Sequence, residues 1–345
     1  MAEIAPDRSA ASIPPMAQLV EMMFGKAHTH LLFMAATLGV ADLLKDGPKS
    51  VEYLAKVANA NTDALARALR ALAGTGVFAE TEPGYFAQTP LSDLLRSDAP
   101  GSLRGMALMT GSDWHNRMWE HLLDSVRTGQ SYFENKYRMD LYEYLREHPA
   151  DQDNLAAAMA SLSGPDAAAV CTTYDFAGIQ TLVDVGGGTG YFLANILKAN
   201  PTLRGILFDQ PAVAEQGRLH IKAEGLDNRC AVMSGDFFRS LPRGDAYTIK
   251  GVIFNWDDQR AGRILARCRE AMNPGGRVLV IDPVIPPGNT PSPSRVLDME
   301  MLVGCSGGRA RTESEFETLF REAGLRLHRN LSMPSVYSII EGIEA

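Results

Sequence analysis

Cysteine is scarce in this sequence, and the cysteines lie far apart. Cys171, Cys230, Cys268 and Cys305 are the only four in 345 residues, and no two form a CxxC pair. This spacing favours reduced, partly buried thiols over a disulfide framework. The sequence also lacks a secretory signal and any run of 18 apolar residues. We therefore expect a cytoplasmic protein that does not enter a membrane.

Positive charge is in the minority. Lys and Arg number 33 against 41 Asp and Glu, which gives a formal net charge of −8. Such a balance argues against a nucleic-acid backbone or an anionic membrane surface as the main partner. With 46% hydrophobic and 21% charged residues, the composition is that of an ordinary globular protein. The length allows two domains, each with a buried core.

Glycine, in contrast, is concentrated in one stretch. The apolar run Thr181–Val185 contains Asp184 and is followed by four glycines within residues 186–190, and a helical pattern begins near Leu193. This order predicts a strand, a tight turn and a helix, a combination that nicotinamide, flavin and S-adenosylmethionine (SAM) folds all use. The acid before the glycines favours SAM, because a carboxylate can hold the ligand's amine. Asp209 ends the next apolar run, where it suits ribose hydroxyls of SAM or NAD equally well.

Strand-like and helix-like segments alternate from residue 178 onward. Strands are expected at 181–185, 205–209, 229–233, 245–249 and 277–282, with helices at 191–200, 211–224 and 258–272 between them. Pro274-Gly275-Gly276 is expected to end the last of these helices. This rhythm predicts an α/β, Rossmann-like, mostly parallel sheet with helices on both faces. A helix at 313–323 and strands at 325–332 and 335–342 complete the chain.

The N-terminal part has a different pattern. Residues 1–15 are predicted to be a flexible arm. Residues 16–45 form one apolar helical pattern wider than a single stripe, as expected of a helix buried on several sides, including against another subunit. Two further helices and a hairpin that turns at Pro83-Gly84 follow in winged-helix order. DNA binding is a poor alternative, because the second helix carries only Arg67 and Arg70 on its charged side and the wing holds the acids Glu80 and Glu82.

These patterns predict four segments: a flexible arm (1–15), a winged-helix-like dimerisation domain (16–102), a helical linker and substrate roof (103–165), and a Rossmann-like domain (166–345). The roof is helical with a turn near Thr128-Gly129, and Ser163-Gly164-Pro165 leads out of it. Its methionines suit either adaptable core packing or the lining of an aromatic substrate site.

The order of segments resembles the SAM-dependent O-methyltransferases of the plant caffeate and hydroxyindole type, which include bacterial natural-product members. The resemblance runs from about residue 20 to the C-terminus. It is carried by Leu69–Leu72 with Gly76–Phe78, Ser125–Gly129, Asp184–Gly190, Asp209, Gly235–Phe238, Lys250, Trp256–Asp258, Asn273–Gly276, and Gly307–Arg309 with Arg311–Glu313.

The resemblance implies a SAM site and a homodimer formed through the N-terminal region. The glycine turn would hold the amino-acid end of SAM, Asp209 the ribose, and Asp236 with Phe237 the adenine. Phe237 and Trp256 have core packing as an alternative role. The full set of implied cofactor residues is Ser163, Asp184, Gly186, Gly188, Gly190, Asp209, Asp236, Phe237, Lys250 and Trp256.

The catalytic residues of the family do not carry over. Members that methylate phenols have a histidine and then an aspartate just before the tryptophan; here Phe254 and Asn255 hold those positions. Of two acids that brace the histidine, one corresponds to Asp282 and the other to Ala310. Phe254 cannot act as a base, although a phenol with a pKa of about 10 gains from one. Metal ligands used by some relatives in this region are missing as well, so no metal is expected.

Other groups could take over proton transfer. His115 and His121 lie near Trp114 and Trp119 in the predicted roof, although each taken alone fits a surface or packed histidine better than a base. Asp282 is the best-placed remaining acid, because ligands of open α/β sheets gather at the carboxyl ends of the strands. The catalytic candidates are therefore Asp282, His115, Phe254 and Asn255.

The sequence thus predicts a SAM-dependent methyltransferase that acts on a small aromatic or enolic natural-product intermediate. Without the histidine base, it would depend on proximity and desolvation, or on an acceptor that is already acidic. Two alternatives remain. One is a SAM-binding enzyme of another class on the same scaffold, such as a hydroxylase, decarboxylase or pericyclase; the other is a binding protein without catalysis.

Overall fold

The computed structural model describes residues 14–345, so the predicted arm at 1–15 falls almost wholly outside the described residues. The chain divides into two compact units with the boundary between Ser112 and Asp113. The finer division into dimerisation domain, roof and cofactor domain remains a prediction. Within residues 14–345, no helix is both long enough and apolar enough to cross a bilayer.

The first unit opens with three helices where one was predicted over 16–45. These are α1 (Pro15–Met23), α2 (Gly25–Thr37) and α3 (Val40–Leu43). The last break comes at Gly39, whose φ of +63° is left-handed and comes directly before α3. Every residue of α1 is exposed within the single chain, whereas Ala35 and Ala36 of α2 join the buried core of the unit.

The rest of the first unit has the predicted order of two helices and a hairpin. Helices α4 (Val51–Val57) and α5 (Thr62–Gly74) precede strands β2 (Phe78–Glu82) and β3 (Tyr85–Gln88), and β3 also pairs with β1 (Lys49–Ser50). Ser50 and Asn61 begin α4 and α5, since their side chains accept backbone N–H groups of the first turn. Helices α6 (Pro90–Asp93) and α7 (Arg104–Thr110) complete the unit.

The second unit starts with five helices: α8 (Asp113–Glu120), α9 (Leu122–Thr128), α10 (Tyr132–Tyr137), α11 (Leu141–Glu147) and α12 (Pro149–Thr173). The expectation that Ser163-Gly164-Pro165 leads out of the helical region is wrong, because the three residues lie inside α12. Burial of Ala158 before Pro165 and Ala167 after it holds the helix together despite the lost backbone N–H.

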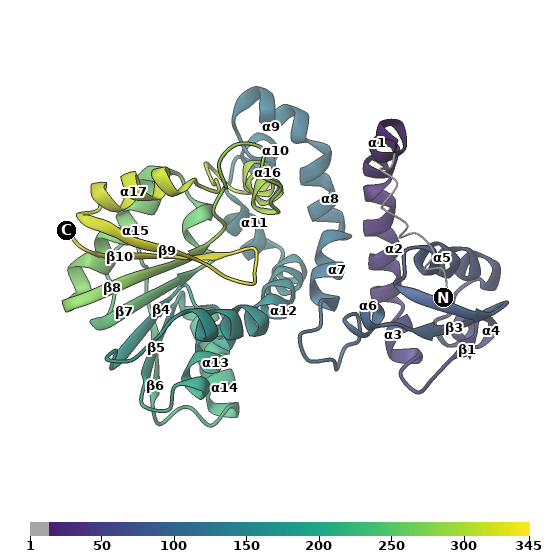
Figure 1. The fold of residues 1–345 in the computed structure, drawn as a ribbon, viewed down its shortest axis with the longest axis horizontal. Coiled ribbons are helices and arrows are strands. Elements are labelled where there is room, and N and C mark those ends of the chain that lie inside the picture. Colours follow the sequence, from purple (N-terminus) through teal and green to yellow (C-terminus); the bar gives the residue numbers. More distant parts are fainter. Residues whose placement is uncertain (1–13) are drawn as a thin grey trace, which may run out of the picture. The chain divides into compact units, whose positions relative to one another are not determined.

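A seven-stranded sheet forms the centre of the second unit, in the order β6-β5-β4-β7-β8-β10-β9 (Figure 1). The first five strands in this order are parallel, and β10 pairs antiparallel with both β8 and β9. The strands are β4 (Thr181–Val185), β5 (Arg204–Asp209), β6 (Cys230–Ser234), β7 (Gly244–Lys250), β8 (Met272–Asp282), β9 (Leu325–Ser332) and β10 (Ser338–Glu344). The predicted α/β, mostly parallel fold is confirmed.

Helices cover both faces of this sheet. Residues of α12 and α13 (Tyr191–Ala199) share one core with Leu182 and Leu279, while α15 (Asp258–Ala271) and α17 (Glu313–Glu322) share the other with Val183 and Val278. Helices α14 (Pro211–Ala223) and α16 (Ser294–Gly304) and the short 3₁₀ helix η1 (Ile253–Asn255) complete the unit. Pro274-Gly275-Gly276 does not separate α15 from β8 as predicted, because β8 already begins at Met272.

The strand order indicates where on the sheet a ligand binds. The chain runs outward from β4 to β6 on one side and returns to β7 on the other, so the order reverses between β4 and β7. In open α/β sheets, ligands bind at the carboxyl ends of the strands beside such a reversal. Asp184, Asp209, Asp236, Asn255 and Asp282 all lie at or just beyond the carboxyl ends of their strands.

Candidate active site

The glycine turn connects β4 to α13 and leaves bare backbone beside a buried acid. Gly186, Gly188 and Gly190 have φ values of +68°, +61° and +76°, which L side chains rarely adopt. At Gly187 the constraint is space, because an added Cβ would lie 2.5 Å from Oδ2 of Asp184. The turn therefore requires glycine both for its conformation and for its close approach to this carboxylate.

Asp184 is 1% exposed and only half satisfied by the protein. Its Oδ1 accepts a hydrogen bond of 2.8 Å from the Thr248 hydroxyl. Its Oδ2 is buried and has no hydrogen-bond partner within residues 14–345. Burial raises the pKa of Asp184 to about 7, against the opposing effects of the Thr248 hydrogen bond and of Lys250. An unpartnered carboxylate oxygen beside bare backbone suits a cationic ligand group, and the amine of SAM fits this description.

Asp209 ties the glycine turn to the neighbouring strand. Its Oδ2 accepts the Gly188 N–H at 2.8 Å, and its Oδ1 accepts the Gln210 N–H at 2.6 Å. Burial raises the pKa of Asp209, while these two backbone donors lower it. Each oxygen keeps lone-pair capacity for a further donor, as a ribose would require.

Aromatic side chains gather beyond β6 and β7, where the sequence predicted the adenine. The ring centroid of Trp256 lies 6.4 Å from that of Phe237 and 5.2 Å from that of Phe238, both edge-on, and Tyr142 of α11 stacks at 5.8 Å. Asp236 accepts the Phe238 N–H at 2.8 Å. Phe237 and Trp256 also pack against the α15 core, so they line this region and support the core at once.

Lys250 and Ser163 are both held by contacts with α12. Lys250 forms a 3.0 Å ion pair with Asp166, and its Nζ lies 5.7 Å from the ring centroid of Phe192. The Ser163 hydroxyl donates to the backbone carbonyl of Met159 within the same helix. The structure thus gives Lys250 an anionic partner that the sequence did not suggest, and leaves the Ser163 oxygen as an acceptor only.

Asp282 braces the segment that follows β7. It is fully buried; its Oδ1 accepts the Gly251 N–H at 3.0 Å and its Oδ2 accepts the Phe254 N–H at 2.9 Å. Burial raises its pKa to about 7, while these N–H groups and Arg311 lower it. Because each oxygen already holds a backbone donor, Asp282 is placed to fix this backbone.

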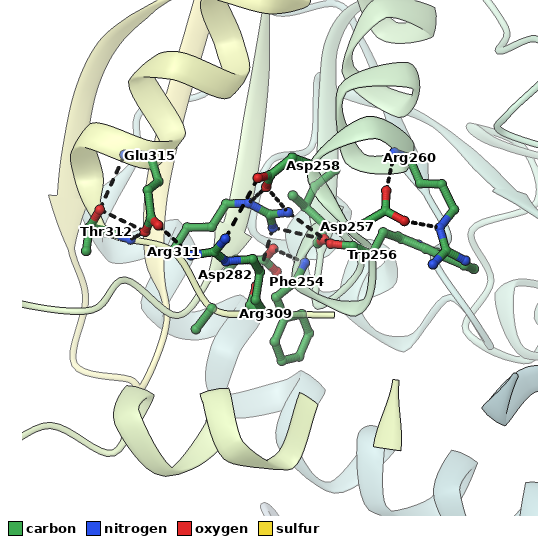
Figure 2. A network of polar contacts seen from close by, with 12 residues as sticks. Phe254, Trp256, Asp257, Asp258, Arg260, Asp282, Arg309, Arg311, Thr312 and Glu315 are labelled. Atoms are coloured by element: carbon green, nitrogen blue, oxygen red, sulfur yellow. Dashed lines mark hydrogen bonds and ion pairs between the residues drawn. The ribbon is translucent and has the colours of Figure 1, made fainter. Parts of the chain in front are cut away.

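Arg311 also holds this segment, through its side-chain donors (Figure 2). Its side chain is 0% exposed and binds Oδ1 of Asp258 through Nε at 2.9 Å and through Nη2 at 2.7 Å. Nη2 also donates to the Trp256 carbonyl at 2.9 Å, and Nη1 donates to the Ile253 carbonyl at 3.3 Å. In Figure 2 the Phe254 ring points away from this polar network. The guanidinium of Arg311 therefore fixes the backbone conformation of residues 253–258.

Phe254 and Asn255 occupy the positions at which the sequence resemblance implies a histidine and an aspartate. Phe254 is 7% exposed, and Asn255 donates from Nδ2 to the Gly251 carbonyl at 2.9 Å. Ala310, at the position of the second bracing acid, is 1% exposed, and its N–H binds Asp298. Neither Phe254 nor Ala310 carries a side chain that can accept a proton.

Among the histidines named as candidates, His115 has a carboxylate partner. Its Nε2 lies 2.8 Å from Oε1 of Glu300 on α16, and Oε2 of the same carboxylate accepts the Trp119 indole N–H at 2.7 Å. His121, in contrast, turns its Nδ1 to the Arg117 carbonyl of its own helical region, at 2.9 Å.

Two models of known protein families match most of the chain. An O-methyltransferase domain matches residues 119–326, and an O-methyltransferase dimerisation domain matches residues 20–98. The chain belongs to the O-methyltransferase family. It is a SAM-dependent methyltransferase with a family dimerisation domain at its N-terminal end.

Relatives resemble this methyltransferase along its length. It is 41% identical over 333 residues to a phenazine O-methyltransferase of Lysobacter antibioticus, covering 96% of this chain and 97% of the relative. It is 37% identical over 316 residues to an 8-amino-8-demethylriboflavin N,N-dimethyltransferase of Streptomyces davaonensis, covering 90% of each chain. The crystal structure of CalO1, a methyltransferase in calicheamicin biosynthesis in its S-adenosylhomocysteine-bound form, is 35% identical, with a TM-score of 0.86 over 97% of this chain and 100% of that one.

Three polar residues of this methyltransferase that contact the predicted site residues escaped the sequence analysis. Thr248 is a lone hydroxyl within a buried strand, and Asp166 follows a proline that suggested a helix end. Glu300 is an acid within the apolar stretch Met299–Val303, a signal that could have marked it. Their partners come from distant parts of the chain, which no local pattern identifies.

Proposed function

We propose that this methyltransferase acts on a small aromatic or enolic natural-product intermediate, without a histidine base at position 254. The observation that carries the proposal is the braced segment after β7. Asp282 and Arg311 fix the backbone of this segment by hydrogen bonds, yet residue 254, where the family resemblance implies a histidine, carries the phenyl ring of Phe254. The acceptor's proton must then leave by another route.

The proposed cofactor contacts follow from the geometry of the second unit. The free Oδ2 of Asp184 and the glycine turn would hold the amino-acid end of SAM, and Asp209 the ribose hydroxyls. Phe237 and Trp256, together with Asp236, would enclose the adenine. SAM supplies an activated methyl group, and these residues fix where that group is presented. An in-line displacement depends on such alignment.

The aromatic character of the substrate is supported by the printed activities of the relatives. These include O-methylation of phenazines, N,N-dimethylation of an aminoriboflavin and 4-O-methylation of an aminohydroxybenzoate by a Streptomyces cremeus enzyme. Both oxygen and nitrogen acceptors occur in this set, so we propose an aromatic or enolic O–H or N–H as the acceptor group. We also propose that the chain works as a homodimer through its dimerisation domain.

The test is incubation of the purified protein with methyl-labelled SAM and a panel of phenols, enols, aromatic carboxylates and arylamines. We expect label in one class of acceptor and one S-adenosylhomocysteine formed per label transferred. Conversion of an acceptor without transfer of label would reject methyl transfer and support another class of enzyme on this scaffold. Binding of SAM without conversion of any acceptor would count against the proposed substrate class.

A further inference from the structure

A buried histidine–carboxylate pair joins α8 to α16, apart from the residues assigned to the cofactor. The side chains of His115 and Glu300 are 8% and 21% exposed, and Nε2 lies 2.8 Å from Oε1. The Trp119 indole N–H holds the other oxygen of Glu300 at 2.7 Å. With two donors on its two oxygens, the Glu300 carboxylate has a fixed orientation toward the imidazole.

This arrangement determines which imidazole nitrogen can accept a proton. A carboxylate accepts hydrogen bonds, so the neutral ring of His115 carries its proton on Nε2 and donates it to Glu300. The free lone pair is then on Nδ1. An acid that selects the tautomer of a histidine in this way is a recurring device for holding a general base ready.

The packing of α8 on α16 relates this pair to the segment after β7. Three residues beyond His115, Met118 lies against Gly304, which is four residues beyond Glu300; a Cβ at Gly304 would be 3.3 Å from the Met118 sulfur. The two contacts are therefore successive layers of one helix pair. Cys305, the next residue, has its Sγ 3.9 Å from Oδ1 of Asn255. Cys305 is five residues beyond Glu300, so the His115–Glu300 pair lies roughly 7.5 Å along the α16 axis from the contact with this segment.

We infer that His115 is the proton acceptor for the methyl acceptor, and that Glu300 and Trp119 are positioning residues that keep the His115 proton on Nε2. The inference rests on the proposed function and adds the substrate class, namely acceptors with a weakly acidic O–H or N–H. The acceptor lone pair forms the new bond to the methyl carbon as the carbon–sulfur bond breaks and its electrons return to sulfur. The acceptor proton passes to Nδ1 of His115, and Glu300 balances the imidazolium charge.

Two variants test this in a series of acceptors of graded acidity. For weakly acidic phenols, His115→Ala should lower kcat by about 10²-fold or more, the usual contribution of a general base. For acceptors already ionised at the assay pH, the loss should be less than about tenfold, because no proton has to be removed. In Glu300→Gln the amide can donate to Nε2 and move the ring proton to Nδ1, so kcat should fall in the same acidity-dependent way.

The controls separate proton transfer from structure. SAM affinity by calorimetry and the KM for the acceptor should change by less than about threefold in both variants, a small free-energy difference. His148→Ala should leave kcat unchanged, because His148 stacks on Tyr144 and binds its backbone carbonyl, as a packed histidine does. Spectra of ¹⁵N-histidine protein provide a readout without turnover: the His115 proton should be on Nε2 in the wild type and on Nδ1 in Glu300→Gln.

Equal losses of kcat for ionised and un-ionised acceptors, or no loss, would overturn the role of His115 while leaving methyl transfer intact. An unchanged tautomer in Glu300→Gln would overturn the role of Glu300. Failure of the wild type to methylate any acceptor would refute the proposed function, and this inference with it.

Discussion

Asp184 carries a carboxylate that folding removes from water. Within residues 14–345 the only hydrogen bond to this carboxylate comes from Thr248, and its second oxygen is buried without a partner. An isolated charge in such a place opposes folding unless the group is protonated or a cation binds. The binding role proposed for Asp184 would therefore come at a cost in the stability of the ligand-free protein, as is common at functional sites.

The pH dependence of stability tests this. Burial raises the pKa of Asp184 from an ordinary value of 3.8 to about 7 in the folded protein. Between these values the folded state binds more protons than the unfolded state, so the free energy of unfolding falls as pH rises. Asp184→Asn removes this pH-dependent contribution to the free energy of unfolding. The Tm of the variant minus the Tm of the wild type, both measured without SAM, should therefore increase from about pH 5 to about pH 8.

Added SAM should raise the Tm of the wild type and have little effect on Asp184→Asn, because ligand stabilisation depends on affinity for the folded state. Differential scanning fluorimetry with and without SAM measures both effects. A Tm difference independent of pH would mean that Asp184 is not the titrating group, leaving Asp282, which has a similarly raised pKa.

Phe254 raises a second question at the residue scale, namely whether one substitution creates a base at position 254 in addition to the one inferred at His115. Phe254→His alone should increase kcat for weakly acidic phenols by less than about tenfold, well below the roughly 10²–10⁴ of a positioned base. The oxygens of Asp282 already hold two backbone N–H groups, and Ala310 has no acceptor to orient the new ring. Adding Ala310→Glu should increase kcat further. A single variant that reaches full general-base rates would show that the orienting acid is dispensable.

Arg311 is the main support of the segment after β7 at the element scale. It is fully buried and contacts Asp258 and the carbonyls of Ile253 and Trp256. Removal of one partner from a buried charged network commonly costs about 3–5 kcal/mol, because the remaining groups lose their compensation. Here Asp258 is largely exposed, so water can take over part of the lost bonding and the lower end of this range is expected.

Arg311→Met keeps the length of the side chain but removes its donors. We expect a clearly lower Tm and weaker SAM binding, since the Trp256 carbonyl loses its anchor next to the proposed adenine site. Arg309→Met is the matched control: Arg309 is 47% exposed and pairs with Glu315 at the surface, where an ion pair contributes about 0–1 kcal/mol. Equal destabilisation by the two substitutions would contradict the role given to Arg311.

The helices and strands also show which parts of the fold the sequence patterns predicted correctly. Strand β4 and helices α13, α14 and α15 begin where the alternation of apolar runs and turn residues predicted, because these patterns are local. The patterns failed at Pro165, where packing overrides a local helix breaker, and over 16–45, where Gly39 ends a helix inside a continuous apolar pattern. The glycine turn was recognisable for the same local reason, whereas the contact of His115 with Glu300 joins residues far apart in sequence.

The apolar surface of α1 is the main unexplained feature at the scale of the whole molecule. Met16, Met22, Met23 and Phe24 are 81%, 68%, 69% and 61% exposed in the single chain, and Leu19 and Val20 are also exposed. A helix that is apolar all round is normally buried. The dimerisation domain matched at residues 20–98 overlaps this region, so we propose a second copy of the chain as the partner that covers it.

Leu19→Glu combined with Met23→Glu places two charges on one face of α1, four residues apart. If α1 lies in a dimer interface, burying these charges without partners opposes association, and an interface of the standard 1,200–2,000 Å² is not expected to tolerate both. Light scattering at micromolar concentration should then show the wild type at twice the 37.5 kDa chain mass and the double variant at or near a single chain mass. Leu219→Glu is the control, since Leu219 is 65% exposed on α14 of the other unit and a charge there should leave the dimer intact.

A monomeric wild type, or a double variant that remains dimeric with unchanged affinity between the two copies, would show that α1 has another role.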